Sequence, residues 1–314
     1  MKQIRFIDLF AGIGGFRLAF ESENIKGKCV FSSEWDESCK KTYEANFHET
    51  PYGDITKVDP IKDIPDFDIL TAGFPCQPFS SIGKREGFMH ATQGTLFFDV
   101  LRILKEKRGK DTPKAFLLEN VIGLTTHEGG NTLLTILKAL EEIGYTADKA
   151  IIDGADFGVP QHRRRIYIVG FRKDLVGEDF RFNFPTDNGK IKYIGEILEE
   201  SWTGYSISKH LQDVYLFKKK DGRPTIVDKN SKFQIKTLVS TYHKIQRLTG
   251  TFVKDGETGL RLFTANECKA IMGFEQDFII PVSRTQMYHQ LGNSVVVPAV
   301  TAIAEKMAEV LKRY

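Results

Sequence analysis

Segments that favour strands alternate with segments that favour helices through the first three fifths of this chain. The strand segments are rich in β-branched and aromatic residues. In order, the expected strands are residues 4–10, 29–33, 68–72, 115–118 and 166–171. The expected helices between them are residues 15–22, 37–46, 96–107 and 131–143. Such alternation predicts an α/β fold with a doubly wound, mostly parallel sheet that is covered by helices on both faces.

The pattern changes near residue 184, where short irregular strands rich in Lys, Gly and Thr predict a smaller second domain. Regular helices return at residues 264–272 and 298–312. The segment from Tyr205 to Thr264 contains twelve Lys or Arg and five Asp or Glu, so its net charge is +7. The whole chain has a net charge of +3, so the remainder carries −4. This uneven charge favours contact with a polyanion, although a solvated surface explains the charge count equally well.

Composition is that of an ordinary globular protein, with 41% hydrophobic and 27% charged residues in a chain of 314. There is no run of 18 or more apolar residues, and a strand pattern replaces any signal peptide, so we expect a cytoplasmic protein without membrane contact. The four cysteines predict neither a disulfide scaffold nor a metal site, because they are few and none forms a Cys-x-x-Cys pair.

Cys76 lies in the turn Gly-Phe-Pro-Cys-Gln-Pro-Phe-Ser, directly after the expected strand 68–72. Open α/β sheets place ligands at the carboxyl ends of their strands, so a thiol held there between two prolines is a candidate nucleophile. A structural role is the alternative, because free cysteine is among the most buried residue types. The flanking prolines and aromatics, together with motifs elsewhere in the chain, favour the reactive role.

A glycine-rich turn, Asp-Leu-Phe-Ala-Gly-Ile-Gly-Gly-Phe at residues 8–16, joins the first expected strand to the first expected helix. Glycines let the backbone approach a ligand at a helix N-terminus. Glu34 ends the second strand, where an acid can bind ribose hydroxyls, and Trp35 could either stack on an adenine or pack in the core. The spacing differs from Gly-x-Gly-x-x-Gly, so the turn favours an adenosine-containing ligand without a pyrophosphate.

Two polar motifs flank the later strands. Glu119, in Glu-Asn-Val, ends the strand 115–118 and would lie near Cys76, although capping the next helix is an equally good explanation. In the Gln-His-Arg-Arg-Arg run at residues 161–165, alternate residues of an extended segment share one face, so Arg163 and Arg165 could converge on one site. A solvated basic strand end is the alternative.

With these motifs in order, the chain resembles a cytosine-C5 DNA methyltransferase of the compact bacterial or phage type, as found in restriction-modification systems. The matching motifs are the glycine-rich loop, the Pro-Cys turn, Glu-Asn-Val, Gln-x-Arg-x-Arg and a closing Gly-Asn-Ser-Val at residues 292–295. The segment from Arg261 to Phe274 also resembles the family sequence that follows the recognition region. The match spans nearly the whole chain except about residues 193–249.

The resemblance implies methyl transfer from S-adenosylmethionine to carbon 5 of a cytosine flipped out of a specific double-stranded DNA sequence, through a covalent bond between Cys76 and carbon 6. The residues implied in catalysis are Cys76, Glu119, Arg163 and Arg165. The residues implied in cofactor binding are Phe10, Gly12, Ile13, Gly15, Glu34, Trp35, Asp54, Ile55, Pro75, Leu96, Asn293, Ser294 and Val295.

By the same resemblance, residues 1–183 and 284–314 form a discontinuous catalytic and cofactor-binding domain, and residues 184–283 form an irregular, β-rich recognition domain. The glycine-containing segment 80–94 directly follows the Cys76 turn and is expected to close over DNA, with a static surface loop as the alternative. The residues expected to contact DNA are Lys84, Arg85, Lys236, Thr237, Ser240, Thr241, Tyr242, His243 and Arg247. We expect a monomer whose partner is double-stranded DNA, and a cognate restriction endonuclease that shares the site without being bound is left open.

Two rival classes fit parts of the sequence. The first is a tRNA cytosine-C5 methyltransferase of the same fold, but that branch of the family carries a Cys-Phe-Thr tripeptide, which does not occur here. The second is an inactive DNA-binding module, which arises when the nucleophile is lost. Cys76, Glu119 and Arg165 are all present, so the sequence favours the DNA methyltransferase.

Overall fold

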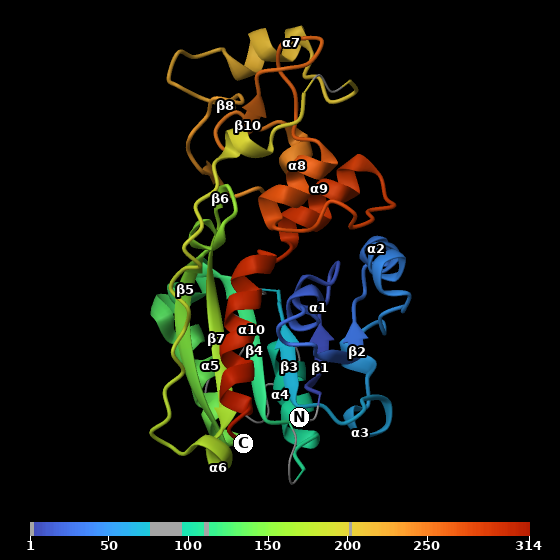
Figure 1. The fold of residues 1–314 in the computed structure, drawn as a ribbon, viewed down its shortest axis with the longest axis vertical. Coiled ribbons are helices and arrows are strands. Elements are labelled where there is room, and N and C mark those ends of the chain that lie inside the picture. The colour runs from blue at the N-terminus through green and yellow to red at the C-terminus, as the bar shows by residue number, and fades with distance from the viewer. Residues whose placement is uncertain (1–2, 76–95, 110–112, 201–202) are drawn as a thin grey trace.

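The computed structural model describes residues 3–75, 96–109, 113–200 and 203–314. Its largest feature is a six-stranded sheet in the order β2-β1-β3-β4-β7-β5 (Figure 1). The strands are β1 (Arg5–Leu9), β2 (Lys28–Ser33), β3 (Ile69–Ala72), β4 (Ala115–Val121), β5 (Tyr145–Asp153) and β7 (Arg164–Arg172). The first four run parallel, and β7 runs antiparallel to both of its neighbours. The predicted mostly parallel α/β sheet is therefore confirmed.

Helices cover both faces of the sheet, because adjacent residues of each strand point to opposite sides. Phe6 and Ile69 belong to one core, and their neighbours Ile7 and Leu70 belong to a second core on the other face. The helices of this region are α1 (Gly15–Phe20), α2 (Glu37–Phe47), α3 (Pro60–Asp63), α4 (Phe97–Glu106), α5 (Asn131–Glu142), α6 (Lys173–Val176) and α10 (Val297–Leu311). Helix α10 packs against α1 and runs along the sheet in front of β4 and β7, so the end of the chain returns to its beginning (Figure 1).

The rest of the chain forms a smaller region beyond the carboxyl edge of the sheet (Figure 1). Its elements are β6 (Gln161–His162), η6 (Ile194–Ile197), α7 (Lys209–Leu211), the π-helix η7 (Gln212–Leu216), β8 (Thr225–Val227), β9 (Ile235–Lys236), η8 (Tyr242–Lys244), β10 (Thr251–Val253), α8 (Ala265–Met272) and α9 (Arg284–Asn293). Strand β8 pairs with β10, and β6 pairs with β9. The domain boundaries at residues 183 and 284 stay a prediction.

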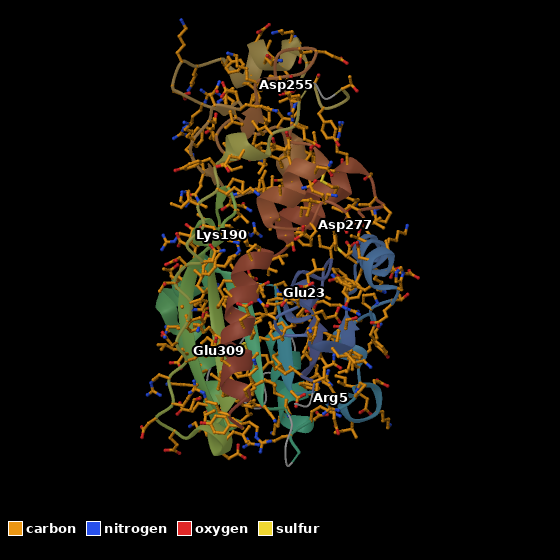
Figure 2. The ribbon with its side chains drawn as sticks, viewed as in Figure 1. Arg5, Glu23, Lys190, Asp255, Asp277 and Glu309 are labelled. Atoms are coloured by element: carbon orange, nitrogen blue, oxygen red, sulfur yellow. The ribbon has the colours of Figure 1, made fainter. Side chains whose placement is uncertain are left out.

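A buried ion cluster organises this small region. Arg261 is fully buried and donates to both carboxylate oxygens of Glu267 at 2.8 Å, with Asp255 at 3.0 Å. Thr264 caps α8, and the Glu267 side chain in turn accepts from the Thr264 backbone N–H. Figure 2 labels Asp255 near the end of the molecule farthest from Arg5 on β1.

Two regular elements differ from the sequence expectations. The sequence pattern did not predict strand β5. This strand lies at the sheet edge, and exposed residues such as Lys149 alternate irregularly with its apolar ones. Helix α9 was not predicted either, because its buried residues Met287, Tyr288 and Leu291 are set among polar ones. Both elements are stabilised by tertiary packing more than by a periodic pattern of their own.

Three of the four cysteines lie in the described ranges, and Cys29, Cys39 and Cys268 are all buried with free thiols. Burial raises the pKa of Cys29 to about 12, so that thiol is protonated and unreactive. No group of three or more His, Cys, Asp or Glu in these ranges could hold a metal ion. None of the described helices is long and apolar enough to cross a membrane.

Candidate active site

A cavity of about 1330 Å³ opens at the carboxyl edge of the sheet. Strands β1, β2 and β3 end level with one another there, because Leu9 of β1 is opposite Ser33 of β2 and Ala72 of β3. Ala72 is opposite Leu118 of β4, and β4 continues to Val121. All thirteen residues predicted to bind the cofactor line this cavity, and so do Glu119, Arg163 and Arg165. Cys76 lies outside the described residues, as do Lys84 and Arg85. The cavity exceeds an ordinary pocket of about 300–1,000 Å³, so it has room for a cofactor and a base together.

The turn between β1 and α1 forms one wall of the cavity. Gly12 has a φ of +55°, a conformation that favours glycine, and a side chain there would point into open space. Gly15 meets the C-terminal segment so closely that a Cβ atom would lie 2.7 Å from Val295 Cγ2 and 3.0 Å from Ser294 Oγ. Glycine at this position therefore lets the closing Gly-Asn-Ser-Val motif reach the turn, although the two motifs are far apart in the sequence.

Acids and an aromatic residue lie beside this turn. Glu34 accepts from the backbone N–H of Gly12 at 2.8 Å and of Asp36 at 2.9 Å, while burial raises its pKa. Asp54 is held by the hydroxyl and amide of Thr56, whose hydrogen bonds lower the pKa of Asp54. Trp35 lines the cavity and is 80% exposed, which is unusual for so large an aromatic. A flat apolar face with acids at two sides fits an adenosine group.

The opposite wall carries an ion pair. Glu119 of β4 and Arg165 of β7 approach to 3.2 Å between Glu119 Oε1 and Arg165 Nε, and both side chains are largely buried. Burial raises the pKa of Glu119, while the positive charges of Arg165 and Arg163 oppose that rise. The pairing is a consequence of strand register, because Val121 is directly opposite Arg165 and Glu119 is two residues earlier on the same face.

The Glu119 strand is also fixed to the start of the Cys76 turn. A Cβ atom at Gly73 would lie 3.7 Å from Glu119 Oε2, and Asn120 Nδ2 donates to the carbonyl of Phe74 at 2.9 Å. Phe74 is two residues before Cys76. The acid and the beginning of the turn are therefore neighbours, and the predicted closeness of Glu119 to Cys76 itself stays a prediction.

The structure gives Arg163 a different environment from Arg165. Arg163 is buried and donates to the carbonyl oxygens of Leu238 at 3.3 Å, Gly292 at 2.9 Å and Ser294 at 2.7 Å. Gln161 works in the same way, since it donates to Ile271 O and accepts from Leu238 N–H. These two side chains join the sheet, the small region and the closing motif. The catalytic role predicted for Arg163 stays a prediction.

Sequence reasoning missed Gln290 of α9, which is buried and lines the cavity. Its amide donates to Ser38 O and Oγ at 2.9 Å and accepts from Thr42 Oγ1 at 2.9 Å, which ties α9 to α2. The only signal for it was its place two residues before the Gly-Asn-Ser-Val motif.

The residues expected to contact DNA divide into two groups. Lys236 is exposed, Thr237, Thr241 and His243 are partly exposed, and the Ser240 backbone packs directly on Gly292 at the cavity. Tyr242 is buried and its hydroxyl donates to Thr251 O at 2.6 Å. Arg247 is also buried and bonds to the carbonyls of residues 216 and 219. Tyr242 and Arg247 thus point into the protein, and we withdraw them as DNA-contacting residues.

The reversed strand in a mostly parallel sheet, with a glycine turn and an acid at the ends of β1 and β2, is the fold of known methyltransferases. A DNMT2 triple mutant from Spodoptera frugiperda has this fold, with a TM-score of 0.78, 24% identity and coverage of 99% of this chain and 100% of that one. The methyltransferase EhMeth from Entamoeba histolytica matches with a TM-score of 0.76, 25% identity and coverage of 100% and 99%.

The chain belongs to the C-5 cytosine-specific DNA methylase family, whose model matches residues 4–309. It is 59% identical to the type II methyltransferase M.MspI of a Moraxella species, over 99% of this chain and 72% of that protein. It is 44% identical to M.HpaII of Haemophilus parainfluenzae, over 99% and 90%. The resemblance stated from the motifs is thereby confirmed, and so are the enzyme class and the cofactor, S-adenosylmethionine.

Proposed function

We propose that this chain methylates carbon 5 of a cytosine that is rotated out of double-stranded DNA at a specific sequence, and that Cys76 is the nucleophile. The observation that supports this most is the Glu119–Arg165 pair, which lies beside the start of the Cys76 turn and opens into the same cavity as the cofactor turn. One cavity therefore joins an acid, a cation and a cofactor wall, as methyl transfer to a base requires.

Carbon 5 of cytosine is too weak a nucleophile to be methylated unaided. The Cys76 thiolate bonds to carbon 6, and the electron pair of the 5,6 double bond moves toward N3, which takes a proton from Glu119. Burial favours the protonated form of Glu119 needed for this step. Arg165, held by Glu119, donates to the cytosine O2 and favours the thiolate through its charge.

Bound S-adenosylmethionine supplies an electrophilic methyl group on a sulfonium. The enamine carbon 5 forms the new carbon–carbon bond, and the methyl–sulfur bond breaks with its electron pair retained by sulfur. Carbon 5 then loses its proton to solvent, the 5,6 double bond re-forms and the Cys76 thiolate leaves. N3 returns its proton to Glu119, which restores the acid for the next cycle. Trp35, Glu34 and Asp54, which line the cavity, would hold the adenosine end, and the Gly12 and Gly15 turn would admit the methionine end.

Trapping tests the covalent step. A duplex containing 5-fluorocytosine has no removable proton at carbon 5, so the wild-type chain should form a stable covalent complex with it in the presence of cofactor. Cys76→Ser should form none, because the hydroxyl is a far poorer nucleophile. Cys268→Ser is the matched control and should trap normally, since Cys268 is buried away from the cavity. Equal trapping by the wild-type chain and Cys76→Ser would contradict the proposal.

The relatives suggest the biological setting. Because relatives at 59% and 44% identity are named type II methyltransferases, we propose that this chain is the monomeric, cytoplasmic modification enzyme of a restriction-modification pair. The cognate endonuclease would share the DNA site without binding the chain. Residues 1–183 and 284–314 would carry out the chemistry, and residues 184–283 would select the sequence. Bisulfite sequencing of plasmid from expressing cells should reveal one methylated sequence. Methylation of tRNA instead of duplex DNA would favour a tRNA cytosine-C5 methyltransferase.

A further inference from the structure

The segment Phe217–Arg223, here called the lysine loop, joins η7 to β8 in the small region. Its side chains include four cations, and all four residues are exposed. They are Lys218, Lys219, Lys220 and Arg223. Within the ranges that the structure describes, none of these four cationic groups has an ion-pair or hydrogen-bond partner. The loop therefore presents concentrated positive charge to solvent.

The loop is held in place from inside the protein. The buried guanidinium of Arg247 donates through Nε to Leu216 O at 3.0 Å and through Nη2 to Lys219 O at 3.1 Å. The same group pairs with Asp221, the one acid of the loop, which neutralises it. A loop whose lysines only kept the protein soluble would not need a buried arginine bonded to its backbone.

Arg247 also places the loop relative to the cavity. Arg247 follows Ser240 by seven residues. The Ser240 backbone is packed on Gly292, which lines the cavity. Seven residues span at most about 25 Å even when fully extended. That distance equals roughly seven base pairs at about 3.4 Å each. A duplex that delivers a base to the cavity spans this distance, and where it runs toward the small region its phosphates come near the lysine loop.

We propose that the lysine loop binds the phosphate backbone of the same duplex beside the methylated site. This inference rests on the proposed function, since it requires DNA to be the substrate. Lys218, Lys219 and Lys220 supply the phosphate contacts, which carry no sequence information, and Arg247 keeps the loop in the conformation that offers them. The loop would govern affinity and salt dependence, while the segment near Ser240 stays beside the cavity.

The test removes the three lysines together, as Lys218→Gln, Lys219→Gln and Lys220→Gln. The control removes three exposed lysines of the sheet domain, which lowers the net charge equally. These are Lys28→Gln, Lys138→Gln and Lys312→Gln. The Kd for a duplex containing the methylated site is measured over a series of KCl concentrations, together with kcat at saturating DNA.

The slope of log K against log salt should fall by about 0.9 for each phosphate that the variant no longer neutralises, or by roughly 2–3 in the loop variant. At moderate salt the Kd should rise at least about tenfold, with kcat and the methylated sequence unchanged. The control should keep the wild-type slope. An unchanged slope in the loop variant, or an equal loss in the control, overturns the inference. If the wild-type chain methylates no DNA, the proposed function itself has failed, so the two failures are distinguishable.

A second variant tests the role of Arg247. Arg247→Met keeps all three lysines but removes the bonds to Leu216 O and Lys219 O. It should weaken duplex binding at low salt by several-fold while leaving most of the salt slope intact, since the cations remain. Wild-type affinity in a folded Arg247→Met protein would show that the loop needs no such support and would overturn this part of the inference.

Discussion

At the carboxyl edge of the sheet, strand register brings Glu119 and Arg165 together, and their polar ends open into a cavity. In the small region, regular structure is sparse. Buried arginines there hold segments in place, as strand pairing does in the sheet. Arg261 binds carboxylates and Arg247 binds loop carbonyls, while neighbouring lysines stay exposed. The comparison shows that a charged side chain near a cavity in the sheet region is a candidate for chemistry, whereas an arginine of the small region is first a candidate for support.

The largest effect should follow from Glu119→Gln. An amide cannot supply the proton to N3, so the methylation rate in a single turnover should fall by about 10²- to 10⁴-fold. The pH dependence gives a second readout. Burial raises the pKa of Glu119, so its proton persists above the ordinary range and the wild-type rate should fall as pH rises through that pKa. The variant should lose this fall.

Glu34→Gln is the matched control for that experiment, because Glu34 is also a buried acid of the cavity but lies at the cofactor turn. It should weaken cofactor binding and keep the wild-type pH profile at saturating cofactor. A Glu119→Gln enzyme that turns over at the wild-type rate would remove the acid from the mechanism and break the contrast between the two regions.

Arg163 lies where the two regions meet, and Arg163→Met should be the most destabilising of these changes. It leaves the carbonyls of Leu238, Gly292 and Ser294 without their donor, and a buried polar group left unpaired costs about 1–3 kcal/mol. We expect a loss of about 3 kcal/mol in urea unfolding and weaker cofactor binding, because Ser294 lines the cavity.

Arg164→Met is the control, and it tests whether replacing any arginine in this run would destabilise the protein. Arg164 is exposed, so its loss should change stability by less than about 0.5 kcal/mol. Equal stability of the two variants would show that the contacts of Arg163 do not hold the regions together. A loss of stability with unaltered cofactor affinity would limit Arg163 to folding.

The sequence predicted the sheet region well, for a physical reason. Parallel strands expose their carboxyl ends at one edge, so motifs that follow strands must meet there, and Gly12, Glu34 and Glu119 do line one cavity. The elements that it missed, β5 and α9, depend on packing against other elements, β5 against β7 and α9 against α8 and η8. No local pattern records those partners.

Prediction of single side chains was weaker. Arg163 and Arg165 share one face of the chain, as predicted, yet Arg163 binds backbone carbonyls and Arg165 binds the carboxylate of Glu119. The contacts of Arg163 depend on the position of the closing Gly-Asn-Ser-Val motif. Tyr242 and Arg247 were assigned to DNA because polar residues cluster around them, and the structure turns both inward. A count of hydroxyls and cations cannot tell an exposed group from one bonded to the backbone.

Tyr242→Phe tests that correction with an intermediate effect. The Tyr242 hydroxyl donates to Thr251 O and accepts from the Phe263 N–H at 3.2 Å. Its loss should destabilise the protein by about 1–2 kcal/mol and leave the Kd for duplex DNA unchanged. Thr241→Ala, at a partly exposed neighbour, should show less effect on urea unfolding. A Tyr242→Phe protein of normal stability but weak DNA affinity would return Tyr242 to the binding surface.

The smallest effect should come from Trp35→Ala, which is the counterpart of Tyr242→Phe in the sheet region. Trp35 is 80% exposed, so its removal should leave urea unfolding unchanged. An adenine stacked on the ring would lose about 0.5–1.5 kcal/mol, which corresponds to a cofactor Kd raised by roughly twofold to thirteenfold in calorimetric titration.

Tyr52→Ala is the control for Trp35→Ala. Tyr52 is an exposed aromatic that contacts Phe31 on β2, yet it is not among the residues that line the cavity. It should leave cofactor affinity at the wild-type value. If both variants weakened the cofactor equally, the effect would come from disturbance of β2, and the exposed face of Trp35 would not be a binding surface. If only Trp35→Ala does so, an exposed aromatic of the sheet region serves binding, whereas a buried aromatic of the small region serves stability.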